Sequence, residues 1–176
     1  MRAPPLASPA ALVIVLALLL AACGGTERLT KEQLVAQGDS ICKEASVKAD
    51  PIGTNLGNPS AETLPQWSDA LGQLLPIYED LVGKLKALNP PEADQATWDK
   101  ITGGLDQIVA GIKTAKDAAS KGDLAGFQTA LAAIDTASGE SGQLASDYGF
   151  QECGDGGSGG ASATVAPATA AATTGP

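Results

Sequence analysis

Apolar residues recur at alternating spacings of three and four through most of the chain between positions 30 and 148. This spacing is typical of amphipathic helices that turn one apolar face towards a shared core. The pattern predicts four helices, over residues 31–49, 64–88, 92–121 and 124–148. The predicted fold class is therefore all-α.

The helix expected over residues 64–88 has the most regular apolar face. Its members are mostly large: Leu64, Trp67, Leu71, Leu74, Tyr78, Leu81, Leu85 and Leu88. The spacing continues unbroken past Pro76, which predicts one helix and not two. Pro76 falls on the outer face, where water can bind the carbonyl that a proline leaves free, and Gly72 leaves room for the ring one turn earlier.

The last two predicted helices have faces of the same kind. The first of them carries Trp98, Ile101, Leu105, Ile108, Ile112, Ala115 and Ala119, and the second carries Leu124, Phe127, Leu131, Ile134, Ser138, Ser141, Ala145 and Tyr148. The connections at 89–91 and 122–123 are short, so consecutive helices must be antiparallel neighbours. A mean apolar period of about 3.5 residues then predicts a left-handed, up-and-down four-helix bundle.

The helix expected over residues 31–49 has the narrowest apolar stripe, and its members are mostly small. Thr30 and Gln33 form a capping-box pattern at its start, and Asp50–Pro51 is expected to end it. Residues 50–63 are rich in Gly, Asn, Pro and Ser and form the one long predicted loop. Two interpretations of this loop stay open: it has a function, or it only crosses the end of the bundle.

The N-terminus has the pattern of a secretion signal. Arg2 precedes an apolar run over residues 10–22 that is too short for a permanent membrane helix. Leu20-Ala21-Ala22-Cys23 resembles the lipobox of bacterial lipoproteins, in which the cysteine receives a diacylglycerol and the chain is cut before it. We expect residues 1–22 to be removed, Cys23 to be lipidated and residues 23–29 to tether the domain to the membrane. The expected location is the outer face of the cytoplasmic membrane or the cell envelope.

Lipidation of Cys23 leaves two cysteines, Cys42 and Cys153. A compartment outside the cytoplasm permits disulfides, and one pair allows one connectivity. A disulfide between Cys42 and Cys153 requires residues 150–153 to fold back along the first helix, and we expect this arrangement. Residues 154–176 are small and nearly uncharged, so they cannot bury enough surface to fold and are predicted to be a disordered tail.

Composition excludes several classes of function. The chain has no histidine, so an imidazole base and imidazole ligands to a metal or haem are impossible. It has 20 acidic residues against 11 basic ones, and such a surface repels nucleic acid. Removal of Arg2 would take the net charge from −9 to about −10. No cofactor is indicated.

Two motifs suggest chemistry but lack the partners that the chemistry needs. Ser40 and Lys43 fit the Ser-x-x-Lys pattern of acyl-enzymes, whose other sequence elements are absent here. Glu92, Asp99 and Asp106 lie seven residues apart, but carboxylate metal sites in bundles also use Glu-x-x-His pairs. We interpret the first pair as surface residues and the second group as a solvated acidic face, and we expect no enzyme activity.

Small residues meet at one level of the predicted bundle. A helical hairpin centred near Gly122 places Gly103 and Gly104 opposite Ser141, with Trp98 and Tyr148 a turn or two away. Either the two helices approach closely at this level, or a cavity opens beneath the aromatic residues; the close packing of natural cores favours the approach. A cavity would bind an apolar ligand between helices. The candidate groove comprises Trp98, Gly103, Gly104, Ser138, Ser141 and Tyr148.

Several stretches are shared with one group of proteins. They are TKEQLVAQGDSICKEA at 30–45, LPIY at 75–78, KALNPP at 86–91, ASKGD at 119–123 and DYGFQEC at 147–153. Together they resemble small secreted lipoproteins of actinobacteria. The resemblance covers about residues 30–153 and implies a helical domain with one disulfide, without implying an activity.

The sequence therefore predicts a non-catalytic, lipid-anchored module of the cell envelope that binds a small apolar ligand or an envelope protein. The alternative is a purely structural envelope component without a ligand. The four aromatic residues Trp67, Tyr78, Trp98 and Tyr148 bear on this choice. They lie on the apolar faces, where they either pack the core or line a pocket.

Overall fold

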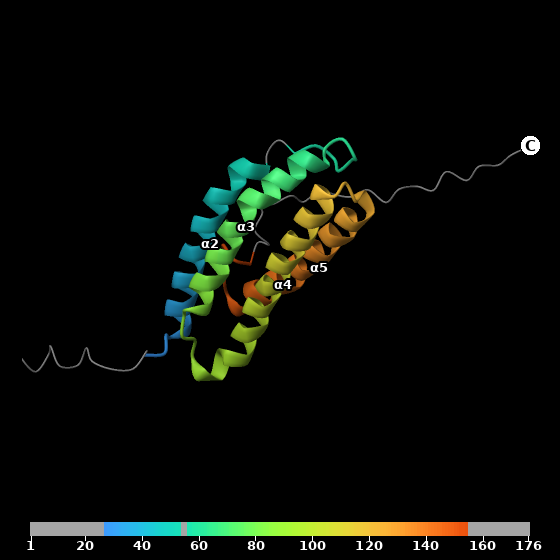
Figure 1. Cartoon of the computed structure of the whole chain (residues 1–176). Helices are drawn as coiled ribbons and strands as arrows, with labels where there is room; N and C mark the ends of the chain where they lie inside the picture. Colours follow the sequence, from blue (N-terminus) through green and yellow to red (C-terminus); the bar gives the residue numbers. More distant parts are fainter. Residues whose placement is uncertain (1–26, 54–55, 155–176) are drawn as a thin grey trace, which may run out of the picture.

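The computed structural model describes residues 27–53 and 56–154 (Figure 1). The predicted signal peptide, the lipobox cysteine Cys23 and almost all of the tail predicted from residue 154 lie outside these residues. Only residues 27–29 of the predicted tether are described.

Four long helices make up most of the described chain. They are α2 (Lys31–Gly53), α3 (Leu64–Lys86), α4 (Gln95–Ser120) and α5 (Leu124–Tyr148), and a short 3-10 helix, η2 (Glu92–Asp94), precedes α4. The described residues form no strand, so the predicted all-α four-helix fold is confirmed. None of the described helices is long and apolar enough to cross a membrane.

Local signals fix several helix ends where the sequence places them. At the start of α2, the Thr30 N–H donates to Gln33 Oε1 at 2.9 Å, and the Gln33 N–H donates to Thr30 Oγ1 at 3.2 Å. Asp123 caps α5 by accepting a hydrogen bond from the Gly126 N–H at 2.9 Å. Gly149 ends α5 at φ 120°, a left-handed conformation that favours glycine.

The predicted end of the first helix is wrong. Instead of ending at Asp50–Pro51, α2 continues to Gly53. Ala49 is buried and Ile52 packs against the same core cluster, so the extra turn buries apolar surface that offsets the hydrogen bond lost at the proline. The prediction for Pro76 is confirmed: α3 runs through it, and Pro76 is exposed.

The helices pack in chain order, which leaves one side of the bundle open. α2 packs against α3, α3 against α4 and α4 against α5, whereas α2 and α5 scarcely touch (Figure 1). The core has two clusters, one around the rings of Trp67 and Phe127 and the other around those of Trp98 and Phe150. Tyr78 packs against both clusters, at the level where they meet.

Candidate functional site

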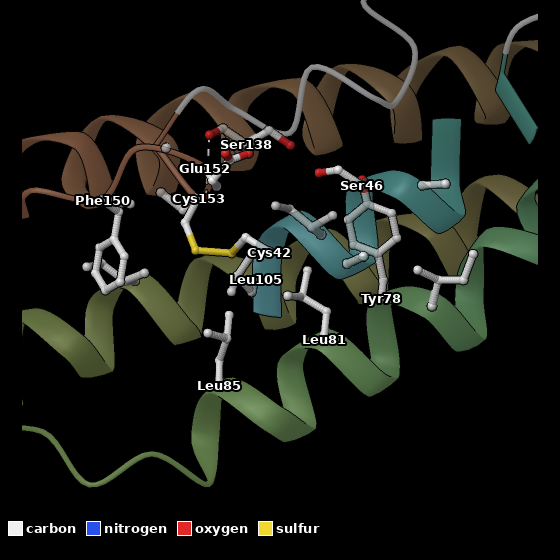
Figure 2. A pocket seen from close by; sticks show the side chains of 18 of the residues that line it. Cys42, Ser46, Tyr78, Leu81, Leu85, Leu105, Ser138, Phe150, Glu152 and Cys153 are labelled. Carbon is white, nitrogen blue, oxygen red and sulfur yellow. Dashed lines mark hydrogen bonds between the residues drawn. A yellow bond between two sulfur atoms is a disulfide. The ribbon is translucent and has the colours of Figure 1, made fainter. Parts of the chain in front are cut away.

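A cleft of about 70 Å³ lies among the four helices, on the side where α2 and α5 do not meet (Figure 2). Side chains from all four helices line it, together with residues of the segment that follows α5. Most of the lining is apolar, which is typical of sites for small ligands.

The sizes of the lining side chains explain why the cleft exists. α3 and α4 contribute large groups: Ile77, Tyr78, Leu81, Leu85, Trp98, Ile101, Leu105 and Ile108. α2 and α5 contribute small ones: Cys42, Ala45, Ser46, Ala49, Ser138, Ser141, Gly142 and Ala145. Short side chains on two helices that are already apart cannot fill the space between them, so an opening remains above a well-packed floor.

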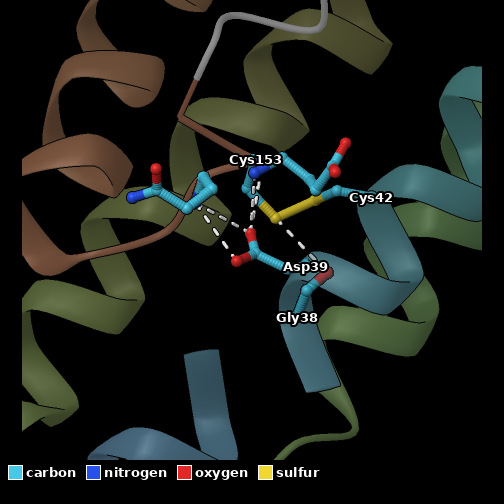
Figure 3. The surroundings of a disulfide bond; sticks show 6 residues. Gly38, Asp39, Cys42 and Cys153 are labelled. Atoms are coloured by element: carbon cyan, nitrogen blue, oxygen red, sulfur yellow. Dashed lines mark hydrogen bonds between the residues drawn. A yellow bond between two sulfur atoms is a disulfide. The ribbon is translucent and has the colours of Figure 1, made fainter. Parts of the chain in front are cut away.

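A short C-terminal segment, residues 150–153, closes one end of the cleft; we call it the hook. Cys153 in the hook forms a disulfide with Cys42 of α2, with 5.3 Å between the Cα atoms (Figure 3). This confirms the predicted pairing and the predicted return of the chain along α2. The disulfide therefore joins the two sides of the bundle that the helices themselves leave apart.

The carboxylate of Asp39 holds the backbone of the hook. Its Oδ1 atom accepts hydrogen bonds from the N–H groups of Gln151 at 3.0 Å, Glu152 at 2.9 Å and Cys153 at 3.3 Å (Figure 3). Hydrogen bonds to an ionised carboxylate are stronger than those between neutral groups. The hook is thus fixed to α2 by a covalent bond and by three charge-assisted contacts.

The ring of Phe150 fills the closed end of the cleft. Phe150 is 1% exposed, and its ring centre lies 5.8 Å from that of Trp98 and 5.5 Å from that of Tyr148. The ring also lies directly against Gly38 of α2, where it occupies the place that a Cβ atom would take. The closed end is therefore largely aromatic, and Glu152 of the hook is the one charged residue in the lining.

The chain enters the bundle at this same end. The Leu29 N–H donates to the Asn89 carbonyl at 2.8 Å, and Arg28 Nη1 donates to the Pro90 carbonyl at 2.9 Å. These bonds attach the segment before α2 to the turn between α3 and α4. The described part of the predicted tether, residues 27–29, therefore lies at the closed end of the cleft.

Tyr148 stabilises the closed end from outside the cleft. Its hydroxyl donates to Asp94 Oδ2 at 2.6 Å, and the Lys31 ammonium group lies 4.4 Å from the centre of its ring. Burial, the hydrogen bond to Asp94 and the negative charges of Asp94 and Glu32 raise the pKa of Tyr148 well above its ordinary value.

A few polar side chains interrupt the apolar lining. The hydroxyl groups of Tyr78, Ser46 and Ser138 have no hydrogen-bond partner among the described residues, whereas the Ser141 hydroxyl donates to the Ala137 carbonyl at 2.7 Å. Burial raises the pKa of Tyr78, which keeps its phenol protonated and able to donate. The cleft therefore offers hydrogen-bonding groups that the protein itself does not use.

The predicted groove residues separate into three places. Trp98, Ser138 and Ser141 line the cleft. Gly104 lies where α4 and α5 meet: a Cβ atom there would be 2.6 Å from the Cβ of Ser141, so the predicted close approach is confirmed. Gly103 faces open space, and Tyr148 does not line the cleft but stacks on Phe150.

Sequence reasoning missed the α2 side of the cleft. Ala45 and Ala49 form part of its wall, and neither was among the predicted site residues. The predicted groove was based only on the register of α4 against α5, which their short connection fixes. The available signal was the small-sided stripe of the first helix, which predicts that this helix cannot fill the space beside it.

The residues of the two motifs that suggest chemistry are exposed. Ser40 and Lys43 are exposed on α2, and Asp106 forms an ion pair with Lys86. No group of three or more His, Cys, Asp or Glu residues that could hold a metal ion occurs within residues 27–53 and 56–154.

The chain matches no protein-family model, no curated protein and no solved structure. The cleft, the hook and the sequence motifs are therefore the basis on which a function is inferred.

Proposed function

We propose that this protein is a lipid-anchored module of the cell envelope that binds a small apolar ligand in the cleft between α2 and α5. The observation that carries the proposal is an apolar cleft left open by small side chains and closed at one end by a covalently fixed segment. Natural cores are close-packed, so an opening of this size at a site reinforced by a disulfide calls for an occupant.

The size of the cleft limits what it can hold. Its volume of about 70 Å³ is well above the roughly 10–15 Å³ that one water molecule requires, but an apolar cavity tends to stay dry. It is about half the size of an apolar cavity of roughly 150 Å³ that takes benzene. A slender hydrocarbon group fits these limits better than a bulky ring system.

The membrane part of the proposal rests on the sequence. The lipobox-like Leu20-Ala21-Ala22-Cys23 would attach two acyl chains at Cys23. From Cys23 to Leu29 the chain can extend at most ~20 Å, and Leu29 is bonded to the turn between α3 and α4. A bilayer anchored through Cys23 would therefore lie near the closed end of the cleft, at the outer face of the cytoplasmic membrane.

The proposed module is not an enzyme. The chain has no histidine, and the one carboxylate that lines the cleft, Glu152, pairs with Lys43. Binding without turnover fits a lining of this composition. The alternative, a structural envelope component without a ligand, predicts that the cleft takes up nothing.

Ligand binding can be tested on the mature chain from residue 23 with Cys23→Ser, which keeps every described residue. Native mass spectrometry would detect a molecule that co-purifies from the secreting cell. Titrations with three probes, 1-monolauroylglycerol, laurate and cholesterol, would then test uptake. We expect at least one single-chain probe to bind.

Two variants locate the binding. Ala45→Leu adds a bulky side chain in the wall of the cleft and should abolish binding, whereas Ala132→Leu adds the same group on the exposed face of α5 and should not. Absence of binding for all three probes, together with no co-purifying molecule, would favour the structural alternative.

A further inference from the structure

The cleft is long and narrow. Trp98 and Ile108 line it about ten residues apart on α4, which corresponds to ~15 Å along the helix. The volume of about 70 Å³ is too small for a fused ring or a branched group, and it holds only a short stretch of an unbranched chain. The cleft therefore favours part of an unbranched hydrocarbon chain as its occupant.

The two ends of the cleft differ in polarity. One end is closed by the rings of Trp98 and Phe150. Figure 2 shows Tyr78 and Ser46 away from Phe150, whereas Ser138 on α5 lies beside Glu152 of the hook. Because the hydroxyl groups of Tyr78 and Ser46 have no protein partner among the described residues, a polar group near them would gain hydrogen bonds, and one between the rings of Trp98 and Phe150 would lose those it makes with water.

The charges around the cleft disfavour an anionic head group. Lys43 pairs with Glu152 at 3.6 Å, and Lys48 pairs with Glu44 at 2.7 Å. Lys84 also pairs with Glu44, at 3.1 Å. Lys43, Lys48 and Lys84 thus each have a carboxylate beside them, and the whole chain has a net charge of −9.

A cationic head group is not favoured either. Glu152 is the one charged residue that lines the cleft, and Lys43 pairs with it at 3.6 Å. The remaining polar lining consists of hydroxyl groups, which recognise uncharged oxygen atoms through hydrogen bonds.

We infer that the ligand is a single-chain amphiphile with an uncharged, oxygen-bearing head group, such as a monoacylglycerol or a long-chain alcohol. Its hydrocarbon tail lies towards Trp98 and Phe150, and its head group bonds to Tyr78 and Ser46. This inference rests on the proposed function, since it specifies the ligand of the same cleft.

Three probes with tails of the same length separate the head groups: 1-monolauroylglycerol is uncharged, laurate is anionic and dodecyltrimethylammonium is cationic. Each is used below its micelle concentration with the mature Cys23→Ser chain. The chain has two tryptophans, so a Trp67→Phe background makes Trp98 the only tryptophan reporter. We expect the monoacylglycerol to bind at least about tenfold more tightly than either charged probe.

The contribution of the head-group site is tested by Tyr78→Phe, which removes one hydroxyl group and keeps the ring. It should weaken binding of the monoacylglycerol by about fivefold to tenfold. Thr129→Val is the control, because its hydroxyl lies on the exposed face of α5, is bonded to the Ala125 carbonyl and does not line the cleft. That control should leave binding unchanged.

The orientation is tested with monoacylglycerols that carry bromine either at the end of the tail or beside the head group. Bromine quenches indole fluorescence at short range, so the terminal bromine should quench Trp98 more strongly. Equal binding of laurate or of the ammonium probe, unchanged binding in Tyr78→Phe, or stronger quenching by the bromine beside the head would overturn this inference and leave the proposed function standing. Failure of these three probes and of cholesterol to bind, together with no co-purifying molecule, would overturn both.

Discussion

The ring of Phe150 lies against Gly38, so that the hook and α2 approach as closely as a residue without a side chain allows. Gly38 is buried within a helix, where glycine has a cost of about 1 kcal/mol relative to alanine. The contact with Phe150 explains why a glycine is present there. The closed end of the cleft depends on this pair, because any side chain at position 38 would displace the ring.

Gly38→Ala should therefore destabilise the protein although alanine is the better helix former. The added methyl group overlaps the Phe150 ring, and overpacking of this kind costs about 1–3 kcal/mol, more than the gain in helix propensity. Urea unfolding would measure the change. Gly83→Ala is the control, since a Cβ at Gly83 of α3 meets nothing within 4 Å; it should stabilise the protein by up to about 1 kcal/mol. Equal effects of the two variants would contradict the role of the Phe150 contact.

Asp39→Ala should loosen the hook while the disulfide remains. The variant leaves the N–H groups of residues 151–153 without their carboxylate partner, at a cost of about 1–3 kcal/mol. A looser hook exposes the disulfide between Cys42 and Cys153, so reduction by dithiothreitol should become faster. Asp135→Ala, on the exposed face of α5, is the matched control and should change neither quantity. Unchanged stability and reduction rate in Asp39→Ala would show that the disulfide alone holds the hook.

Two adjacent glycines of α4 should respond in opposite ways to the same substitution. Gly104→Leu forces a large side chain into the contact with Ser141 and should destabilise the fold by about 1–3 kcal/mol. A Cβ atom at Gly103 meets nothing within 4 Å, so Gly103→Leu should be neutral or mildly stabilising. Thermal or urea unfolding distinguishes the two, and similar losses in both variants would contradict the close approach of α4 and α5.

The contrast between these glycines and the cleft shows what the sequence could predict. The turn at Gly122 fixes the register of α4 against α5, so the contact between Gly104 and Ser141 follows from counting residues outward from the turn. No comparable turn joins α2 to α5. Their separation depends on how the two helical hairpins pack, and that is set by side-chain sizes on all four helices together. The cleft wall at Ala45 and Ala49 therefore could not be predicted from any single connection.

The same distinction applies to the end of α2. The local rule that Asp50–Pro51 ends a helix is correct for an isolated segment. In the folded protein Ile52 gains core contacts that the rule does not include. The disulfide was predictable for the opposite reason, because two cysteines left after lipidation allow only one pairing.

Stability should fall at high pH because of buried phenol groups. The folded state raises the pKa of Tyr148 and of Tyr78. Each protonated phenol therefore makes its full contribution to stability below the unfolded pKa of about 10. Each contribution is lost as pH rises from this value towards the folded pKa. Tyr148→Phe should therefore lower stability at neutral pH, where the hydrogen bond to Asp94 is lost, and flatten the decline above about pH 10. Urea unfolding between about pH 8 and pH 11 would test this, and an unchanged slope would contradict it.

The lipid anchor is tested in the bacterium that makes the protein. The Cys23 thiol is the atom that the lipobox presents for acylation, so Cys23→Ala should accumulate as an unprocessed precursor and fail to appear as a lipidated mature form. Gel mobility measures cleavage of the precursor, and metabolic labelling with a fatty acid measures acylation. The control is the double variant Cys42→Ser/Cys153→Ser, which loses the disulfide but keeps the lipobox, and should still be processed and labelled. A Cys23→Ala protein that is cut normally and remains on the membrane at the wild-type level would rule out the lipoprotein assignment, because no other residue of the lipobox can carry the acyl chains.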